Sequence, residues 1–500
     1  MQMPLNGRPR TVITALLAPV LLGAAPSLAA QSGVPRLEHS ECPFERGDWA
    51  RDIQLECAWL IVPEMRDHPT GRTVRLAVAV VRAKNPITTP LVMLHGGPGL
   101  SGLRIFLPFA ASSAISQTRD MVIYDQRGAG YSEPKLCPDY SAVEDSARRL
   151  RTFAERERLW DARDRACVAS LRAQGIDPAA YNTSASARDL IDLRKALGYA
   201  TWDVFSSSYG ARLAQEAMRQ DPRGIRSVVM GSPVTLGPER HAEVALSIQR
   251  AIEHVWKECA AQTSCNAAFP NVGDDFYALY DELSRQPLPA PVKRDSGVVD
   301  TVWIDGKRLL SAIRNNVLGR PGRLARLPLL VNELRRGDRA RAAEILAGYD
   351  TNAGATNQQV PLHLVNCYDV YGPAFRAARD SANALAHPAF RSDGLDECPV
   401  WQTRFADPSE YRPVRSDIPT LILTGRFDDR TPTEQARRIA ATLSHAYLYE
   451  FPNEGHDARP AGCHLSILMQ FFENPFRAPD ASCIAGIPPI LFVTGWDDRK

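Results

Sequence analysis

The sequence predicts an α/β fold: a mostly parallel central sheet with helices on both faces and an inserted, mainly helical segment. Short β-rich runs alternate with helical stretches between residues 72 and 232, which is the pattern of βαβ units. Helical periodicity dominates residues 236–412, and the alternation of strand and helix then resumes. We therefore expect residues 37–235 and 413–500 to form two parts of one core, with residues 236–412 as an inserted helical lid.

Seven strands are expected in that core. Residues 91–94 (LVML) and 121–124 (MVIY) are continuous apolar runs, as expected of strands that are covered on both faces. Two helices should complete the second part of the core, at 433–443 and 463–472. The other strands are expected at residues 74–81, 203–205, 227–230, 420–424 and 446–451.

Length and charge restrict the classes of function. Five hundred residues exceed what one hydrophobic core usually serves. The 59 basic and 57 acidic residues nearly balance, so no charge excess indicates a nucleic acid or an anionic membrane as partner. We therefore expect a soluble mature protein that acts on a peptide or small molecule and binds no nucleic acid. Its oligomeric state is not indicated.

The N-terminus has the features of an export signal. Arg8 and Arg10 precede an apolar run at residues 12–25, and small residues follow at 27–29. The apolar run contains Pro19 and is too short to span a bilayer. We expect residues 1–29 to be a signal peptide and the mature chain, without a membrane span, to be periplasmic or extracellular. A buried N-terminal helix is the alternative.

The cysteines support export, because an even number in a chain with a signal sequence suggests disulfides. Their clustering into five neighbouring pairs predicts that each pairs with its neighbour, and several free buried thiols are the alternative. The ten are Cys42, Cys57, Cys137, Cys167, Cys259, Cys265, Cys367, Cys398, Cys463 and Cys483.

A candidate nucleophile lies where the expected strand at 203–205 runs into a helix. Ser208 occupies the turn of the run SSSYG at 206–210, and a serine at such a turn is raised above the sheet at the helix N-terminus. Gly210 is small on one side, whereas Ser206 stands where the G-x-S-x-G pattern has glycine. The alternative is an ordinary serine N-cap.

Glycines after another strand indicate an oxyanion hole. Residues 95–99 (HGGPG) follow the expected strand at 91–94, where backbone N–H groups can approach a developing oxyanion. We assign the two donors to the amides of Tyr209 and of Gly97 or its immediate neighbour. A plain Gly-Pro loop is the alternative.

The acid and the base are expected after the last two strands. Asp428 follows the strand at 420–424, with adjacent Asp429 as a competitor, and His456 follows the strand at 446–451. The chain order Ser, Asp, His is one that such a fold uses. His456 would take the proton of Ser208, and Asp428 would orient the imidazole and stabilise its charged form.

These motifs together resemble the proline iminopeptidase and tripeptidyl aminopeptidase group of α/β hydrolases, from about residue 40 to 490. The matching segments are HGGPG at 95–99, DQRGAGYS at 125–132, SYG at 208–210 and the cysteine-bearing segments, which are similar to the secreted branch. The resemblance implies the α/β-hydrolase fold, action on a free N-terminus and a lid acid that pairs with the substrate ammonium. The candidates for that acid are Glu243, Asp274, Asp275 and Glu282.

Asp125 and Arg127 of the second motif are expected to form a buried ion pair that stabilises the turn. The first functional hypothesis is therefore an aminopeptidase that forms an acyl-enzyme. The second is a carboxylesterase or lipase-like enzyme with the same triad, and the third is a binding module without activity. No phosphate-binding glycine loop, metal-ligand cluster or haem motif occurs in the sequence, so no cofactor is expected.

Overall fold

The computed structural model describes residues 33–496, except 87–88, 238, 294–296, 352–358, 393, 402 and 457–461. Within these residues, nine strands form one sheet in the order β1-β2-β3-β5-β4-β6-β7-β10-β11. From β5 to β11 neighbouring strands are parallel, and β1, β2, β3 and β5 pair antiparallel. The strands are β1 Arg36–Ser40, β2 Leu55–Pro63, β3 Thr73–Val81, β4 Leu91–Leu94, β5 Met121–Tyr124, β6 Trp202–Ser207, β7 Ile225–Gly231, β10 Thr420–Gly425 and β11 Ala446–Phe451.

The predicted α/β fold is confirmed, and helices cover both faces of the sheet. On one face α4 (Thr183–Ala196), α5 (Tyr209–Gln220) and α17 (Thr433–Ala440) share a core with Val92 and Leu94. On the other, α1 (Gly102–Ser112) and α18 (Gly462–Glu473) pack with Leu91 and Met93. Because successive side chains of β4 enter opposite cores, its continuous apolar run is explained.

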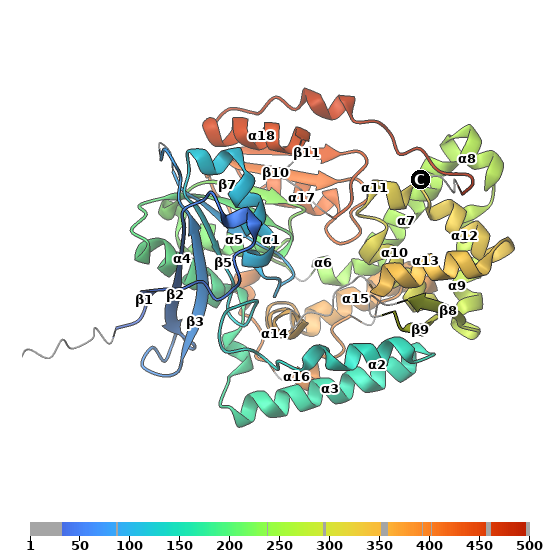
Figure 1. The fold of residues 1–500 in the computed structure, drawn as a ribbon, viewed down its shortest axis with the longest axis horizontal. Coiled ribbons are helices and arrows are strands. Elements are labelled where there is room, and N and C mark those ends of the chain that lie inside the picture. Colours follow the sequence, from blue (N-terminus) through green and yellow to red (C-terminus); the bar gives the residue numbers. More distant parts are fainter. Residues whose placement is uncertain are drawn as a thin grey trace, which may run out of the picture.

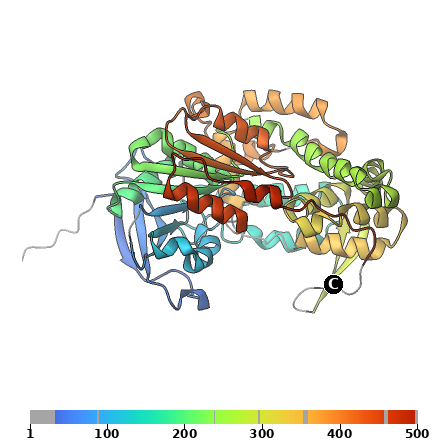
Figure 2. The ribbon, with the colours of Figure 1, turned by 90° about the horizontal axis from the view of Figure 1, so that it is seen from above.

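A second body of helices lies to one side of the sheet (Figures 1 and 2). It has its own hydrophobic core, whose residues lie between Ile248 and Phe492 in the sequence and include Phe427. The boundaries expected for the lid, 236 and 412, stay a prediction. Its helices are α6 Glu239–Ala242, α7 Val244–Ala261, α8 Thr263–Ala268, α9 Val272–Arg285, α10 Gly306–Asn316, α11 Pro321–Leu324, α12 Leu327–Arg336, α13 Arg339–Thr351, α14 Gln359–Asp369, α15 Pro373–Leu385 and α16 Cys398–Trp401.

Some elements were not anticipated from the sequence. Strands β1 and β2 precede the expected ones, and a hairpin of β8 (Leu288–Lys293) and β9 (Val299–Ile304) lies in the segment expected to be mainly helical. Helices α2 (Glu144–Arg149) and α3 (Phe153–Ala173) belong to the first part of the chain. Nevertheless, α3 packs against α16, so the two bodies share an extended contact.

All ten cysteines form disulfides, each with its neighbour in sequence: 42–57, 137–167, 259–265, 367–398 and 463–483. The expected signal peptide, residues 1–29, lies outside the described residues. Among the residues that are described, no helix combines the length and the apolar character needed to cross a bilayer.

Candidate active site

Ser208 occupies a sharp turn between strand β6 and helix α5. Its backbone has φ +56° and ψ −122°, a left-handed conformation that is uncommon for a residue with a side chain. The Ser208 amide donates to the Gly231 carbonyl of β7 at 2.9 Å, and the Ser208 carbonyl accepts from the Ala211 amide at 3.0 Å. The turn is therefore held from both sides, by the neighbouring strand and by the helix that it starts.

Small residues surround this turn because other backbone segments pass close to it. A Cβ on Gly210 would lie 2.3 Å from the Leu94 carbonyl oxygen, and one on Gly96 would lie 2.7 Å from the Ser208 Cβ. Ser206 replaces the glycine of the usual pattern, and it is fully buried. Its hydroxyl donates to the Val229 carbonyl at 2.7 Å, which satisfies the extra polar group.

The two expected oxyanion donors belong to two segments that adjoin Ser208. Gly97 has φ +111°, a value at which a side chain would be strained, and its loop packs on Ser208 through Gly96. Tyr209 is the first residue of α5, and the first N–H groups of a helix have no acceptor within that helix. Both amides thus come from segments that adjoin the candidate nucleophile.

The structure brings Ser208, His456 and Asp428 into one hydrogen-bonded chain. His456 Nε2 lies 2.9 Å from Ser208 Oγ. His456 Nδ1 lies 2.9 Å from Asp428 Oδ2 and 3.0 Å from Oδ1. Nδ1 therefore carries a proton toward the carboxylate, which leaves Nε2 free to accept the proton of the serine hydroxyl.

Asp428 is fully buried and has several other donors. The amides of Arg430 and Thr431 donate to Oδ1 at 2.9 and 2.8 Å, and the Thr431 hydroxyl donates to Oδ2 at 2.7 Å. Burial raises the pKa of Asp428, but His456 and the Thr431 hydrogen bonds outweigh burial and hold that pKa below its ordinary value. The carboxylate is therefore charged at neutral pH.

Thr431 was not anticipated from the sequence. Its Oγ1 also lies 3.0 Å from His456 Nδ1 and 2.9 Å from the Ser232 carbonyl oxygen. An aspartate often accepts hydrogen bonds from backbone amides two or three residues later in a turn. The run DDRTP at 428–432 could therefore have indicated Thr431 as a partner of Asp428. Asp429, the competing acid, instead pairs with Arg314 of α10, with Nε and Oδ2 2.9 Å apart.

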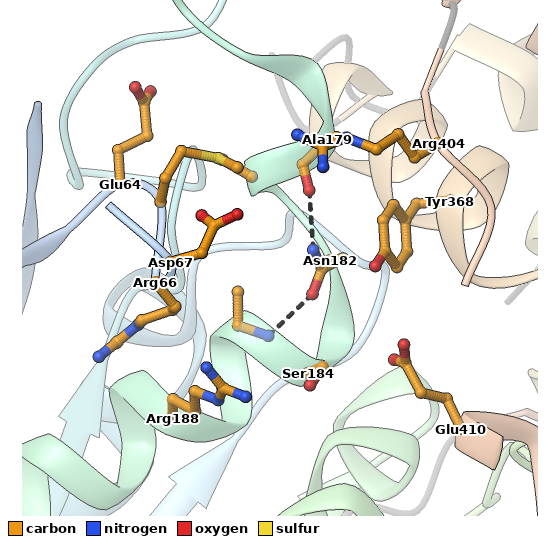
Figure 3. Close-up of a pocket in the computed structure, with 13 residues that line it drawn as sticks. Glu64, Arg66, Asp67, Ala179, Asn182, Ser184, Arg188, Tyr368, Arg404 and Glu410 are labelled. Carbon is orange, nitrogen blue, oxygen red and sulfur yellow. Dashed lines mark hydrogen bonds between the residues drawn. The ribbon is translucent and has the colours of Figure 1, made fainter. Parts of the chain in front are cut away.

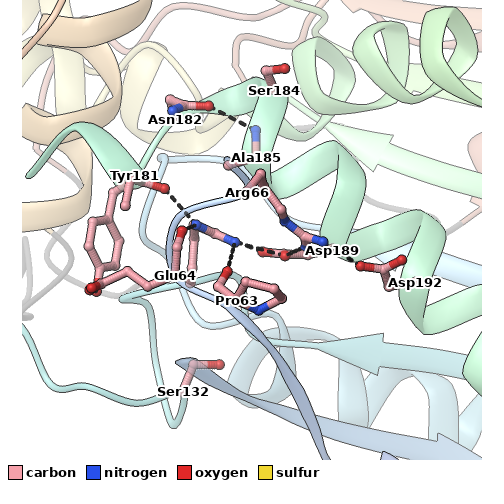
Figure 4. A network of polar contacts seen from close by, with 12 residues as sticks. Pro63, Glu64, Arg66, Ser132, Tyr181, Asn182, Ser184, Ala185, Asp189 and Asp192 are labelled. Carbon is pink, nitrogen blue, oxygen red and sulfur yellow. Dashed lines mark hydrogen bonds and ion pairs between the residues drawn. The ribbon is translucent and has the colours of Figure 1, made fainter. Parts of the chain in front are cut away.

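The expected ion pair between Asp125 and Arg127 was wrong. Asp125 accepts from the Ser101 hydroxyl and from the amides of Leu103 and Tyr131. The Arg127 guanidinium instead pairs with Asp189 of α4, 2.7 Å away. Figure 4 shows Asp189 among its polar neighbours, which include Arg66 and Asp192. Because a buried guanidinium has five donors to satisfy, it requires a carboxylate together with carbonyls, which α4 and the end of β2 provide.

The four candidate lid acids are not joined to the triad by any hydrogen bond or ion pair among the described residues. Glu243 pairs with Arg438, Asp275 with Arg336 and Glu282 with Arg335. Asp274 is exposed. Three of the four are thus already neutralised by arginine.

A separate pocket of about 250 Å³ lies near the start of α4 (Figure 3). Glu64, Asn182, Tyr368 and Glu410 are among its lining residues, and no residue of the candidate triad is. Three acidic and three basic side chains line it, so its walls carry no dominant charge.

Comparisons with known proteins support the fold and indicate a reaction class. Residues 89–254 match the model of the alpha/beta hydrolase fold family, and residues 384–483 match that of TAP-like proteins. The tripeptidyl aminopeptidase of Streptomyces coelicolor is 25% identical over 82% of this chain and 78% of that one. Carboxylesterase B of Mycobacterium tuberculosis is 25% identical over 91% and 92%.

A solved proline iminopeptidase of Mycobacterium smegmatis is 16% identical, with a TM-score of 0.36, and covers 86% of this chain and 98% of that chain. That similarity is too weak to add to the assignment. The assignment of fold and reaction class rests on the sheet order, the strand-to-helix turn and the two family matches. The chain has the α/β-hydrolase fold, and it is a serine hydrolase.

Proposed function

We propose that the protein is an exported aminopeptidase that removes N-terminal prolyl or short peptidyl groups through an acyl-enzyme on Ser208. The observation that carries the proposal is the hydrogen-bonded chain from Ser208 through His456 to Asp428. In hydrolysis, His456 Nε2 removes the hydroxyl proton as Ser208 Oγ attacks the scissile carbonyl. His456 then returns this proton to the leaving amine, and water releases the acyl group by the same route.

The tetrahedral intermediate carries a negative oxygen, which the amides of Gly97 and Tyr209 stabilise in this proposal. A preorganised donor of this kind contributes about 3 to 4 kcal/mol to transition-state stabilisation. Asp428 holds the imidazole in the tautomer that attack requires and stabilises the imidazolium that forms. Its low pKa supports this role, because the acid remains charged throughout the cycle.

The peptidase assignment and the export of the chain rest on different support. The similarity to the tripeptidyl aminopeptidase favours a peptide substrate. Export is supported by the signal-like N-terminus and by the five disulfides, which persist in oxidising compartments.

A second candidate function is carboxylester hydrolysis, which the similarity to carboxylesterase B favours. The same triad performs both reactions, because it determines acyl transfer and not the acyl group. An arylamide is harder to cleave than an activated ester, so turnover of amides separates the two functions.

The test is a panel of prolyl, alanyl and tripeptidyl arylamides, each with a free and a blocked amino end, measured beside nitrophenyl esters. We expect turnover of the free-amine arylamides, loss of turnover on blocking, and loss of all activity in Ser208→Ala. Ester turnover without amide turnover would favour the esterase. Activity retained by folded Ser208→Ala would refute the nucleophile.

A further inference from the structure

The residue after the nucleophile is held by a buried polar chain that reaches into the helical body. Tyr209 is buried, and its hydroxyl lies 2.9 Å from the Thr183 hydroxyl. Thr183 is the first residue of α4, whose N-terminus is capped by the Asn182 side chain. The Tyr209 ring is therefore anchored at the start of a helix and not among loosely packed apolar side chains.

The chain ends at Asp369, the last residue of α14. This carboxylate accepts from the Thr183 hydroxyl through Oδ2 and from the Thr183 amide through Oδ1, at 3.3 Å for the amide. It also lies 3.4 Å from Arg212 Nε, and Arg212 donates to the Asp369 carbonyl at 3.3 Å. Because Arg212 lies one turn after Tyr209 on α5, one carboxylate restrains the first turn of that helix at two points.

Removing the Asp369 carboxylate from water carries a desolvation cost, which argues for a specific role. Asp369 is almost fully buried, and burial raises its pKa although Arg212 and Thr183 oppose that effect. A buried ion pair is often less stabilising than well-packed apolar residues of similar volume. What it provides is a defined geometry, since the carboxylate accepts hydrogen bonds only in particular directions.

We infer that Asp369 is a positioning residue for acyl transfer: through Thr183 and Arg212 it fixes Tyr209, and with it the backbone N–H next to Ser208. The inference deepens the proposed function and rests on it. The disulfide between Cys367 and Cys398 ties the end of α14 to α16, which limits movement of the carboxylate. The helical body therefore acts on the oxyanion side of the site through Asp369.

The pocket of Figure 3 provides a matched control. Asn182 and Tyr368, the sequence neighbours of Thr183 and Asp369, line it. Tyr368→Phe changes one polar atom next to Asp369 without touching the chain to Tyr209. If any disturbance at the end of α14 lowered kcat, Tyr368→Phe should lower kcat as well.

The experiment compares Asp369→Asn, Thr183→Val and Thr183→Ser with Tyr368→Phe, and measures kcat, KM and the rate of labelling by a fluorophosphonate. We expect Asp369→Asn and Thr183→Val each to lower kcat about 10- to 100-fold, as displacement of a reacting group by about 1 Å does. KM should stay within about threefold, because ground-state binding is untouched. Thr183→Ser should keep kcat near the wild-type value, because it retains the hydroxyl, and Tyr368→Phe should match the wild type. In the double variant of Asp369→Asn and Thr183→Val, the fold-loss of kcat should be smaller than the product of the two single fold-losses.

Unchanged kcat and labelling in folded Asp369→Asn would overturn the inference. So would equal losses in Thr183→Val and Thr183→Ser, a comparison that remains decisive if Asp369→Asn does not fold. Failure of the proposed function would be seen separately, because the wild-type protein would then not turn over free-amine arylamides, whether or not it was labelled at Ser208. Labelling of Ser208 that is equally fast in all variants would retain the serine hydrolase and reject the positioning role.

Discussion

The two sides of the candidate site are positioned in different ways. On the nucleophile side, Ser208 is placed by the sheet itself: Gly210 rests on the end of β4, and Ser206 is bonded to β7. On the acid and base side, the loops after β10 and β11 are held by the helical body. Arg314 pairs with Asp429, and a Cβ on Gly455 would lie 2.4 Å from the Leu318 carbonyl oxygen.

This difference indicates that the helical body is part of the catalytic scaffold. Phe427, next to Asp428, belongs to its hydrophobic core, and Asn315 of α10 accepts from Arg430 at 2.5 Å. A segment that only covered the site could move away without disturbing the triad. Here such a movement would pull on the residues that flank both Asp428 and His456.

The largest effect should separate the two adjacent aspartates. Asp428→Asn should lower kcat about 10⁴-fold, because an amide favours the wrong imidazole tautomer. Asp429→Asn removes only the contact to Arg314 and should cost about tenfold or less. Steady-state kinetics on the best arylamide or ester measures both, and a larger loss for Asp429→Asn would reverse the assignment of the acid.

Next in size are two glycine substitutions, one on each side. Gly455→Ala forces the loop before His456 away from Leu318, and Gly96→Ala forces the oxyanion loop away from Ser208. Each should lower kcat about 100-fold, as a misplaced catalytic group does. Steady-state kinetics measures both variants, and an unchanged kcat in either would show that the close contact on that side does not position the site.

Two disulfides should separate the helical body from the antiparallel edge of the sheet in their effects on stability and activity. Replacing Cys367 and Cys398 by alanine should lower the free energy of unfolding by about 3 to 4 kcal/mol for the loop that they close, and should also lower kcat. Replacing Cys42 and Cys57 should cost about 3 kcal/mol and leave kcat of the folded protein unchanged. Urea titrations with kinetics below the transition test both, and equal effects on kcat would contradict the comparison.

Acidification should weaken the acid and base side. The pKa of Asp428 is lower in the folded chain than its ordinary value, so its contribution to stability is present at neutral pH and is lost as pH falls through the folded pKa. The difference in unfolding free energy between the wild type and Asp428→Asn should shrink from pH 7 toward pH 3. A difference that grew on acidification would show that the folded state raises this pKa.

The smallest effect is expected at Ser206. Ser206→Ala removes one buried hydrogen bond to Val229 and should cost about 1 kcal/mol of stability. Because the turn is held by other contacts, kcat should stay within about threefold of the wild type. A loss of more than tenfold in a stable variant would mean that the Ser206 hydroxyl shapes the turn.

Local patterns in the sequence were sufficient for the sheet's centre. The run at 91–94 coincides with β4 and that at 121–124 with β5, because burial on both faces leaves a continuous apolar signature. The strand that runs directly into a helix at Ser208 was also predicted from the local sequence. Strands β1 and β2 and the hairpin of β8 and β9 lacked such a signature, and they were not anticipated.

By itself, then, the sequence determined the α/β fold, the turn at Ser208 and the strand ends after which an acid and a histidine lie. Tertiary structure alone decided which of two neighbouring carboxylates faces His456, that Asp189 and not Asp125 binds Arg127, and that Asp369 reaches the first turn of α5. The physical reason is the distance along the chain over which each kind of interaction acts. Turn and burial preferences depend on a few consecutive residues, whereas a buried charge selects its partner from groups that only packing of distant segments brings within hydrogen-bond distance.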